Sequence, residues 1–138
     1  MAFVGNPRDK TNSFYVLTSP IVQAANTYIQ EHDLNRIAYD ITGASMDQLE
    51  SYIVKGIPVL TWITIDLEPA RVNKSLKWQE RNTLKEHIPY INLHAVVLLR
   101  IDDNYAHVMN PLTGYESIPI DVFKQSFESL QSRAVVVY

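Results

Sequence analysis

The stretch NLHAVVLLRIDDNYAHVMNPLTG, residues 92–114, is the part of the sequence that decides the fold. An apolar run is followed by the polar residues 102–104, and a second alternating segment then ends at the turn formers of residues 110–114. Two β-type segments on either side of a short polar turn are typical of a β-hairpin. The first strand of this hairpin carries His94 near its start, and the second carries Asn110 at its end.

The length of the turn decides whether these two side chains meet. We expect residues 102–104 to form a three-residue turn, in which case Ile101 pairs with Tyr105. Because side chains alternate between the two faces of a strand, His94 and Asn110 then lie on the same face, as diagonal neighbours about 7–8 Å apart at Cα. A two-residue turn would shift the pairing by one residue and put them on opposite faces.

The remaining pattern predicts an α+β fold in a single domain, residues 1–138. Ser19 and Ser45 are the predicted N-caps of the first two helices. The long polar segment at residues 67–90 is typical of a functional or disordered loop, with a short helix possible at 74–85. The late strands follow one another through short turns, which favours antiparallel pairing. The predicted elements, in order, are helix 19–32, strand 35–42, helix 45–56, strand 57–66, the hairpin 91–110, a helix from residue 121 and strand 133–138.

Composition excludes several classes of function. The 138 residues carry a formal net charge of −3 with dispersed basic residues, which leaves no electrostatic footprint for nucleic acid. No apolar run is long enough to cross a bilayer, and the first residues do not resemble a signal peptide. Because the chain has no cysteine, it has no disulfide and no thiolate nucleophile. His32, His87 and His107 fit no metal-ligand spacing, so we expect neither a metal nor another cofactor.

His94 and Asn110 have a chemical meaning as a pair. In thiol catalysis an imidazole lies beside the nucleophile, and an amide oxygen holds that imidazole in one tautomer and one orientation. A histidine in an apolar strand is more often structural, however, and Asn-Pro followed by Gly is more often only a turn. From composition and spacing alone, the structural interpretation is favoured.

The order of the segments changes this weighting. Four segments together resemble the bacterial peptidase domains related to the double-glycine leader peptidases, which are papain-like cysteine peptidases. These segments are FVGNP, PIVQAANTYI, DITGASMDQLESYIVKGIPVLTWITID and HAVVLLRIDDNYAHVMNPLTGYESIPIDVFKQSF. The resemblance spans nearly the whole chain, and it is most specific at residues 56–59, 94–98, 102–103 and 110–114. It implies a papain-like half with an antiparallel sheet and flanking helices. Proteins of this family are often exporter-associated, secreted or on the bacterial cell surface.

The resemblance also implies a role for each member of the pair. His94 maps to the family's general base, and Asn110, which precedes Pro111, maps to the residue that orients this base. The family more often has Asp at that position, and it usually has Gly-Tyr or similar residues where this chain has Arg100-Ile101. The family's N-terminal catalytic helix, with its nucleophilic Cys, has no counterpart here. We therefore expect either a fragment of a longer protein or a degenerate domain.

Three functions are consistent with this sequence. The first is a cysteine-peptidase-like domain that is inactive as this chain and becomes a thiol peptidase if a longer native chain supplies the Cys. The second is a degenerate module that binds peptide segments without cutting them, and the third is an unrelated α+β interaction domain in which His94 is structural. The expected partner is a peptide or protein segment, and apolar surface left by the missing helix would favour a homodimer. Trp62 is a candidate for lining the substrate cleft, although a buried core position is favoured.

Overall fold

The computed structural model describes residues 4–5, 13–79, 84 and 86–138. Its elements are β1 (Val4–Gly5), β2 (Ser13–Tyr15), α1 (Thr18–Glu31), β3 (Ala38–Asp40), α2 (Met46–Ile53), β4 (Val59–Thr64), β5 (Trp78–Gln79), β6 (Glu86–His87), β7 (Leu93–Ile101), β8 (Tyr105–Asn110), β9 (Gly114–Pro119), α3 (Ile120–Ser129) and β10 (Ala134–Val137). Six strands form one antiparallel sheet in the order β3-β10-β4-β7-β8-β9. The predicted α+β class with an antiparallel sheet and flanking helices is confirmed.

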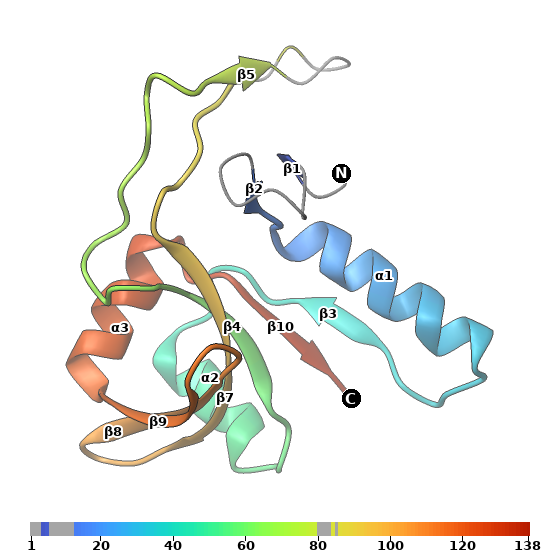
Figure 1. Cartoon of the computed structure of the whole chain (residues 1–138). Coiled ribbons are helices and arrows are strands. Elements are labelled where there is room, and N and C mark those ends of the chain that lie inside the picture. Colours follow the sequence, from blue (N-terminus) through green and yellow to red (C-terminus); the bar gives the residue numbers. More distant parts are fainter. Residues whose placement is uncertain (1–3, 6–12, 80–83, 85) are drawn as a thin grey trace.

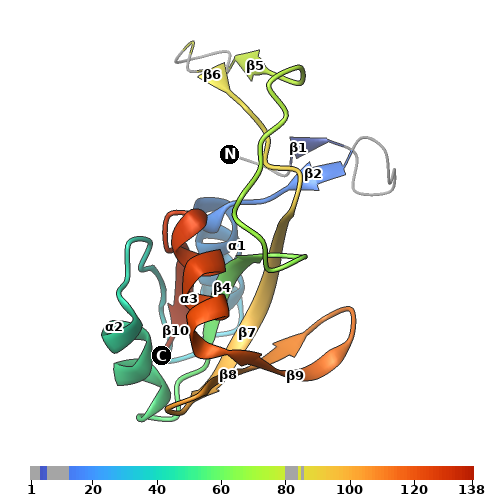
Figure 2. The same cartoon turned by 90° about the vertical axis from the view of Figure 1, so that its left-hand side faces the viewer.

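Helices cover both faces of this sheet. α2 and α3 pack on one face, whereas α1 lies on the other, against β3 and β10 (Figures 1 and 2). The first face holds the larger core, in which Leu49 of α2 and the stacked rings of Phe123 and Phe127 of α3 are fully buried. A smaller core lies under α1 around Trp62. Because strand side chains alternate, residues of one parity face α2 and α3, and those of the other parity face α1.

The turn between β7 and β8 is tighter than predicted. Ile101 pairs with Ala106, and the backbone N–H of Asp102 donates to the carbonyl of Tyr105 at 3.0 Å. The Asp102 carboxylate also accepts the backbone N–H groups of Asn104 and Tyr105, which stabilises this tight turn. The predicted pairing of Ile101 with Tyr105 is therefore wrong. Taken alone, this one-residue shift would carry the two candidate site residues to opposite faces.

A β-bulge reverses that shift. The register changes by one residue between Leu98 and Arg100, so Leu99 is the extra residue on this strand. Beyond the bulge, Leu98 pairs with Val108, which is the register that a three-residue turn would have produced. The tight turn and the bulge each shift the register by one residue, and the two shifts cancel. His94 and Asn110 therefore lie on the same face of the sheet.

The two predicted helix starts have different outcomes. Ser45 caps α2 and forms a capping box with Gln48: its Oγ accepts the Gln48 N–H at 3.2 Å, and the Gln48 side chain accepts the Ser45 N–H at 2.9 Å. The prediction of Ser19 as an N-cap is wrong, because α1 already begins at Thr18. The Thr18 hydroxyl instead donates to Asp40 Oδ2 at 2.5 Å and ties the start of α1 to β3.

β9 is a strand that the sequence pattern did not predict. It pairs with β8 over its whole length, from Asn110 opposite Gly114 to Tyr105 opposite Pro119. Gly114 has a φ of 91°, a conformation that glycine adopts without steric cost. Only Ile118 of this strand is buried, so its apolar pattern is too weak to indicate a strand.

Residues 67–90 are here called the arm, and its described residues leave the sheet between β4 and β7 (Figures 1 and 2). Within its described part, β5 pairs with β6, and Val72 forms an isolated bridge with Tyr90. The predicted helix at 74–85 is wrong for residues 74–79, which form a turn and the strand β5. Residues 80–83 and 85 of that prediction lie outside the described residues.

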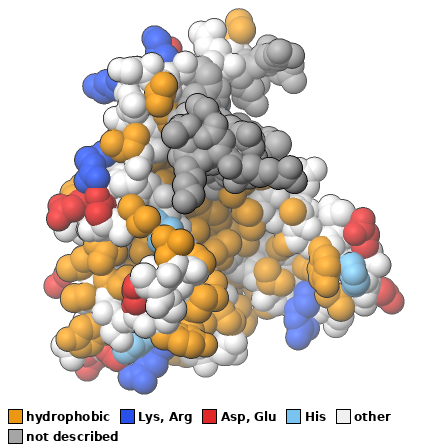
Figure 3. Space-filling model, viewed as in Figure 1, with side chains coloured by type: hydrophobic (Ala, Val, Ile, Leu, Met, Phe, Trp, Pro, Cys, Tyr) orange, Lys and Arg blue, Asp and Glu red, His pale blue; other side chains and the backbone are white. Residues whose placement is uncertain are grey.

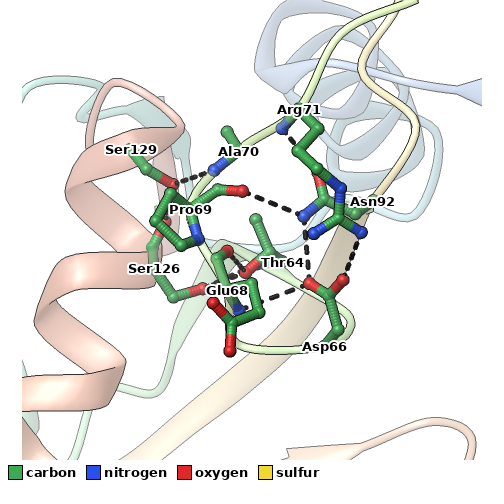
Figure 4. A network of polar contacts seen from close by, with 9 residues as sticks. All are labelled: Thr64, Asp66, Glu68, Pro69, Ala70, Arg71, Asn92, Ser126 and Ser129. Atoms are coloured by element: carbon green, nitrogen blue, oxygen red, sulfur yellow. Dashed lines mark hydrogen bonds and ion pairs between the residues drawn. The ribbon is translucent and has the colours of Figure 1, made fainter.

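One half of a polar network joins the base of the arm to α3 (Figure 4). The backbone N–H of Thr64, at the end of β4, donates to Ser126 Oγ at 2.7 Å, and the Thr64 hydroxyl donates to the carbonyl of Glu68 at 2.6 Å. The N–H of Ala70 donates to Ser129 Oγ at 3.0 Å. Because Thr64 and Ser126 are both buried, these bonds satisfy polar groups that water does not reach.

The other half of the network centres on Asn92, the residue before β7 (Figure 4). Its side chain is buried, accepts the N–H of Arg71 at 2.9 Å, and donates to Asp66 at 2.9 Å and to the carbonyl of Pro69 at 3.2 Å. The hydrogen bond from Asn92, followed by that from Arg71, holds the pKa of the Asp66 carboxyl below its ordinary value. The network therefore fixes the chain two residues before His94.

Candidate active site

His94 lies near the start of β7, where it pairs with Ile63 of β4. Val96 and Leu98 follow on the same face of the strand and are buried in the core against α2 and α3. His94 is half-buried, so it continues this apolar row to a position that solvent reaches. The strand thus places an imidazole at the margin of the main core.

A hydrogen bond to Asn110 fixes one nitrogen of this ring. His94 Nε2 lies 2.9 Å from Asn110 Oδ1, and the same oxygen accepts the backbone N–H of Leu112 at 3.0 Å. An amide oxygen only accepts, so His94 Nε2 carries the proton and, in the neutral ring, Nδ1 keeps the lone pair. Among the described residues Nδ1 has no hydrogen-bond partner.

The other end of the Asn110 amide is fixed by Glu116 of β9. Asn110 Nδ2 donates to Glu116 Oε2 at 3.2 Å, and the hydroxyl of Thr113 donates to Glu116 Oε1. In the ladder Glu116 pairs with Val108, which makes it a diagonal neighbour of Asn110 on the same face. Three adjacent strands therefore contribute His94, Asn110 and Glu116 to one chain of hydrogen bonds.

Glu116 is the member of this hydrogen-bonded chain that the sequence pattern did not indicate. The hydrogen bonds from Thr113 and then from Asn110 lower the pKa of its carboxyl, with a smaller contribution from the charge of His94. A carboxylate is therefore present beside the amide at neutral pH. The six-residue spacing from Asn110 could have indicated this contact, but only with β9 predicted as the next strand.

This arrangement has the geometry of two of the three parts of a nucleophilic site, a base and the group that orients it. A neutral imidazole with a free Nδ1 accepts a proton from a neighbouring nucleophile, while the bond from Nε2–H to an amide oxygen keeps the ring oriented. The third part is missing from the described residues, since no hydroxyl or amine lies within hydrogen-bond distance of Nδ1, and the sequence has no cysteine.

Trp62 does not line this site. It lies next to Ile63 in β4, so its side chain is on the sheet face opposite that of His94. It is 1% exposed, and its indole N–H donates to the carbonyl of Val16 at 3.0 Å. The substrate-cleft interpretation of Trp62 is therefore corrected: it is a core aromatic whose polar atom is satisfied.

A second histidine belongs to a separate hydrogen-bond chain on the other face of β8. His107 Nδ1 lies 2.9 Å from Ser117 Oγ, and Nε2 lies 2.7 Å from Asp102 Oδ2. Asp102 also accepts the guanidinium of Arg100 at 2.9 Å. The hydrogen bond from His107, and then those from the turn backbone, hold the pKa of Asp102 far below its ordinary value. Although the order of groups is that of a serine hydrolase, all of them lie within β7–β9 and the β7–β8 turn, and we assign them to hairpin structure.

An apolar groove lies on the face of the sheet that carries α1. It is lined by Ile21 and Ala25 of α1 and by Leu60, Val97 and Val135 of the sheet. Figure 3 shows hydrophobic side chains gathered over the middle of the molecule, beside α1. This surface has the character that the predicted homodimer requires, and the homodimer stays a prediction.

The part of the chain that the structure describes contains neither a candidate metal site nor a helix that could span a membrane. No group of three or more His, Asp or Glu side chains is arranged to hold a metal ion. In the same residues, no helix has the length and apolar character that crossing a membrane requires.

Comparisons with known proteins place this chain in a family. The model of the Peptidase C39-like family matches residues 1–135. A crystal structure described as a C39-like peptidase from Bacillus anthracis is similar to this chain, with 25% sequence identity and a TM-score of 0.80. The similarity covers 99% of this chain and 66% of that one, so the chain spans just under two thirds of its solved relative. No curated protein matches. The chain belongs to the Peptidase C39-like family and has the α+β fold of its solved relative.

Proposed function

We propose that this chain is a cysteine-peptidase-like domain of the double-glycine leader peptidase kind, which provides the general base and its orienter and is catalytically silent by itself. The observation that supports this most is the bond between His94 Nε2 and Asn110 Oδ1, because it leaves the lone pair on Nδ1. The absence of any cysteine supports the silence of the 138-residue chain. The match to the Peptidase C39-like family supports the peptidase-like class.

In a longer protein that supplies a cysteine, the two residues would have defined tasks. His94 Nδ1 accepts the thiol proton, and the thiolate attacks the carbonyl carbon of the peptide bond. The resulting imidazolium then donates that proton to the leaving amine, and water releases the acyl group from sulfur. Throughout, the Asn110 oxygen accepts from Nε2–H and keeps the ring in place.

A second candidate function is recognition of a peptide segment without cleavage. It is favoured by the complete chain of hydrogen bonds from His94 through Asn110 to Glu116 in a sequence without cysteine. These hydrogen bonds leave an imidazole nitrogen that has no partner among the described residues, and a carboxylate whose oxygens can each accept a further bond. Both can pair with the backbone N–H groups of a bound peptide.

One pair of assays tests both functions. A fluorogenic peptide with a Gly-Gly sequence before the scissile bond is incubated with the 138-residue chain and with a chain extended by its adjoining coding sequence. We expect cleavage only by an extended chain that contains cysteine, and its loss in His94→Ala but not in His32→Ala, because His32 is exposed at the end of α1. Cleavage that survives His94→Ala would contradict the proposed base.

The second assay measures binding and uses the 138-residue chain alone. The same peptide is added while backbone amide signals are followed by NMR. We expect the signals of His94, Asn110 and Glu116 to shift. Shifts confined to other surfaces, or none at millimolar peptide, would contradict a peptide-binding role for this site.

A further inference from the structure

We infer that Glu116 is a positioning residue that, together with the backbone N–H of Leu112, determines which end of the Asn110 amide faces His94, and thereby which ring nitrogen keeps its lone pair. The inference rests on the proposed function of His94 and deepens it, because it concerns how the base is prepared. It uses one observation that neither the family match nor the sequence pattern provides, the contact between Asn110 Nδ2 and Glu116 Oε2 at 3.2 Å.

The two ends of an asparagine amide have the same shape and opposite hydrogen-bonding character. The oxygen accepts and the nitrogen donates, so the orientation depends on what lies at each end. At one end of Asn110 lies a carboxylate, Glu116, which only accepts. At the other end lie His94 Nε2 and the backbone N–H of Leu112. Only the orientation with Oδ1 toward His94 satisfies all three neighbours.

The reversed orientation would disable the base. Asn110 Nδ2 would then face His94 and donate to Nε2, which would have to carry the lone pair. The proton of the neutral ring would move to Nδ1, the nitrogen that must accept the proton of a nucleophile. At the same time Oδ1 would face the Glu116 carboxylate, and two acceptors would lie against each other. A charge-assisted bond to Glu116 therefore opposes the inactive tautomer.

Glu116 is itself held for this task. Thr113 occupies its second oxygen, and the tight turn that carries Thr113 also brings β9 back beside β8. The lowered pKa of Glu116 means that its carboxyl is ionised, and both of its oxygens remain acceptors, at neutral pH. The carboxylate thus offers Nδ2 an acceptor that does not switch to a donor.

A matched pair of variants separates the acceptor from the rest of the side chain. Glu116→Gln keeps an amide oxygen that accepts from Asn110, whereas Glu116→Met has similar length and lacks a good acceptor. The readout is the tautomer of the neutral His94 ring, taken from its ¹⁵N shifts in long-range ¹H–¹⁵N spectra and assigned by the signal lost in His94→Ala. We expect Glu116→Gln to keep the Nε2–H form and Glu116→Met to give a mixture with Nδ1–H.

Two controls keep the result interpretable. Tyr115→Ala alters the neighbouring, 83% exposed residue of β9 and should leave the ring unchanged. Thr113→Val removes the support of the carboxylate and should change the tautomer in the same direction as Glu116→Met, which covers the case that Glu116→Met fails to fold. An Nε2–H ring in both Glu116→Met and Thr113→Val would overturn the inference, and so would an equal change in Tyr115→Ala. These spectra need no substrate, so their outcome is independent of whether the peptide assays support the proposed function.

Discussion

Asn92 should contribute more to stability than any surface asparagine of the chain, because it joins the base of the arm to the start of β7. Its side chain is 2% exposed and makes three hydrogen bonds, to Arg71, Asp66 and Pro69. A typical bond of this kind contributes about 0.5–1.5 kcal/mol net, and the bond to the exposed Asp66 contributes at the low end. Asn92→Ala should therefore lower the free energy of unfolding by about 2–3 kcal/mol.

Urea denaturation and thermal unfolding, both followed by circular dichroism, measure this loss. For a chain of this size, a loss of about 1 kcal/mol lowers the midpoint of thermal unfolding by roughly 3–5 °C, so this midpoint should fall by about 10 °C. The matched control is Asn35→Ala, since the Asn35 side chain is exposed and makes no hydrogen bond within the described residues. This variant should stay within about 0.5 kcal/mol of the wild type. An Asn92→Ala variant as stable as Asn35→Ala would refute the assignment of Asn92 as the anchor of β7.

Three further predictions concern the helix caps, the loss of stability at acidic pH and the lack of peptidase activity. Ser45→Ala should cost about 1 kcal/mol in urea denaturation because it removes the capping box of α2, whereas Ser19→Ala should cost nothing measurable; equal losses would contradict this difference. The hydrogen bonds from Asn92 and Arg71 lower the pKa of Asp66, so this carboxylate stabilises the fold above about pH 4 and the contribution is lost as pH falls through the lowered pKa. Asp66→Asn should therefore lose less stability on acidification than the wild type does. An equal loss of stability in both proteins as pH falls would count against this prediction. The purified chain should not hydrolyse peptides or react with thiol-directed inhibitors, since it has no cysteine. Fluorophosphonate labelling that disappears in Ser117→Ala would show that the His107 chain is a second reactive site.

The sequence predicted the elements whose signals are local. The capping box of α2 depends on two residues, Ser45 and Gln48, and the apolar runs of β4 and β7 are long enough to indicate buried strands. Ser19 failed as an N-cap because Pro20 fits the first turn of a helix that begins at Thr18 equally well. Local signals therefore predicted that an element exists better than where it begins.

The register of the hairpin could not be predicted, because it depends on two features that compensate each other. The Asp102 side chain favours a tight turn, and the bulge at Leu99 then restores the parity of the strand. Neither feature has a strong sequence signal, and only their combination brings His94 to Asn110. Glu116 was missed for a related reason, since the strand that carries it has only Ile118 buried.

The most direct test of the account is the tautomer of the neutral His94 ring in the unmodified 138-residue chain. Long-range ¹H–¹⁵N spectra of the neutral ring report which nitrogen carries the proton. We expect the Nε2–H form, with its proton protected from exchange by the bond to Asn110, and loss of that protection in Asn110→Leu. An Nδ1–H ring, or an Nε2 proton that exchanges equally fast in wild type and Asn110→Leu, would contradict the claim that Asn110 holds His94 as a base.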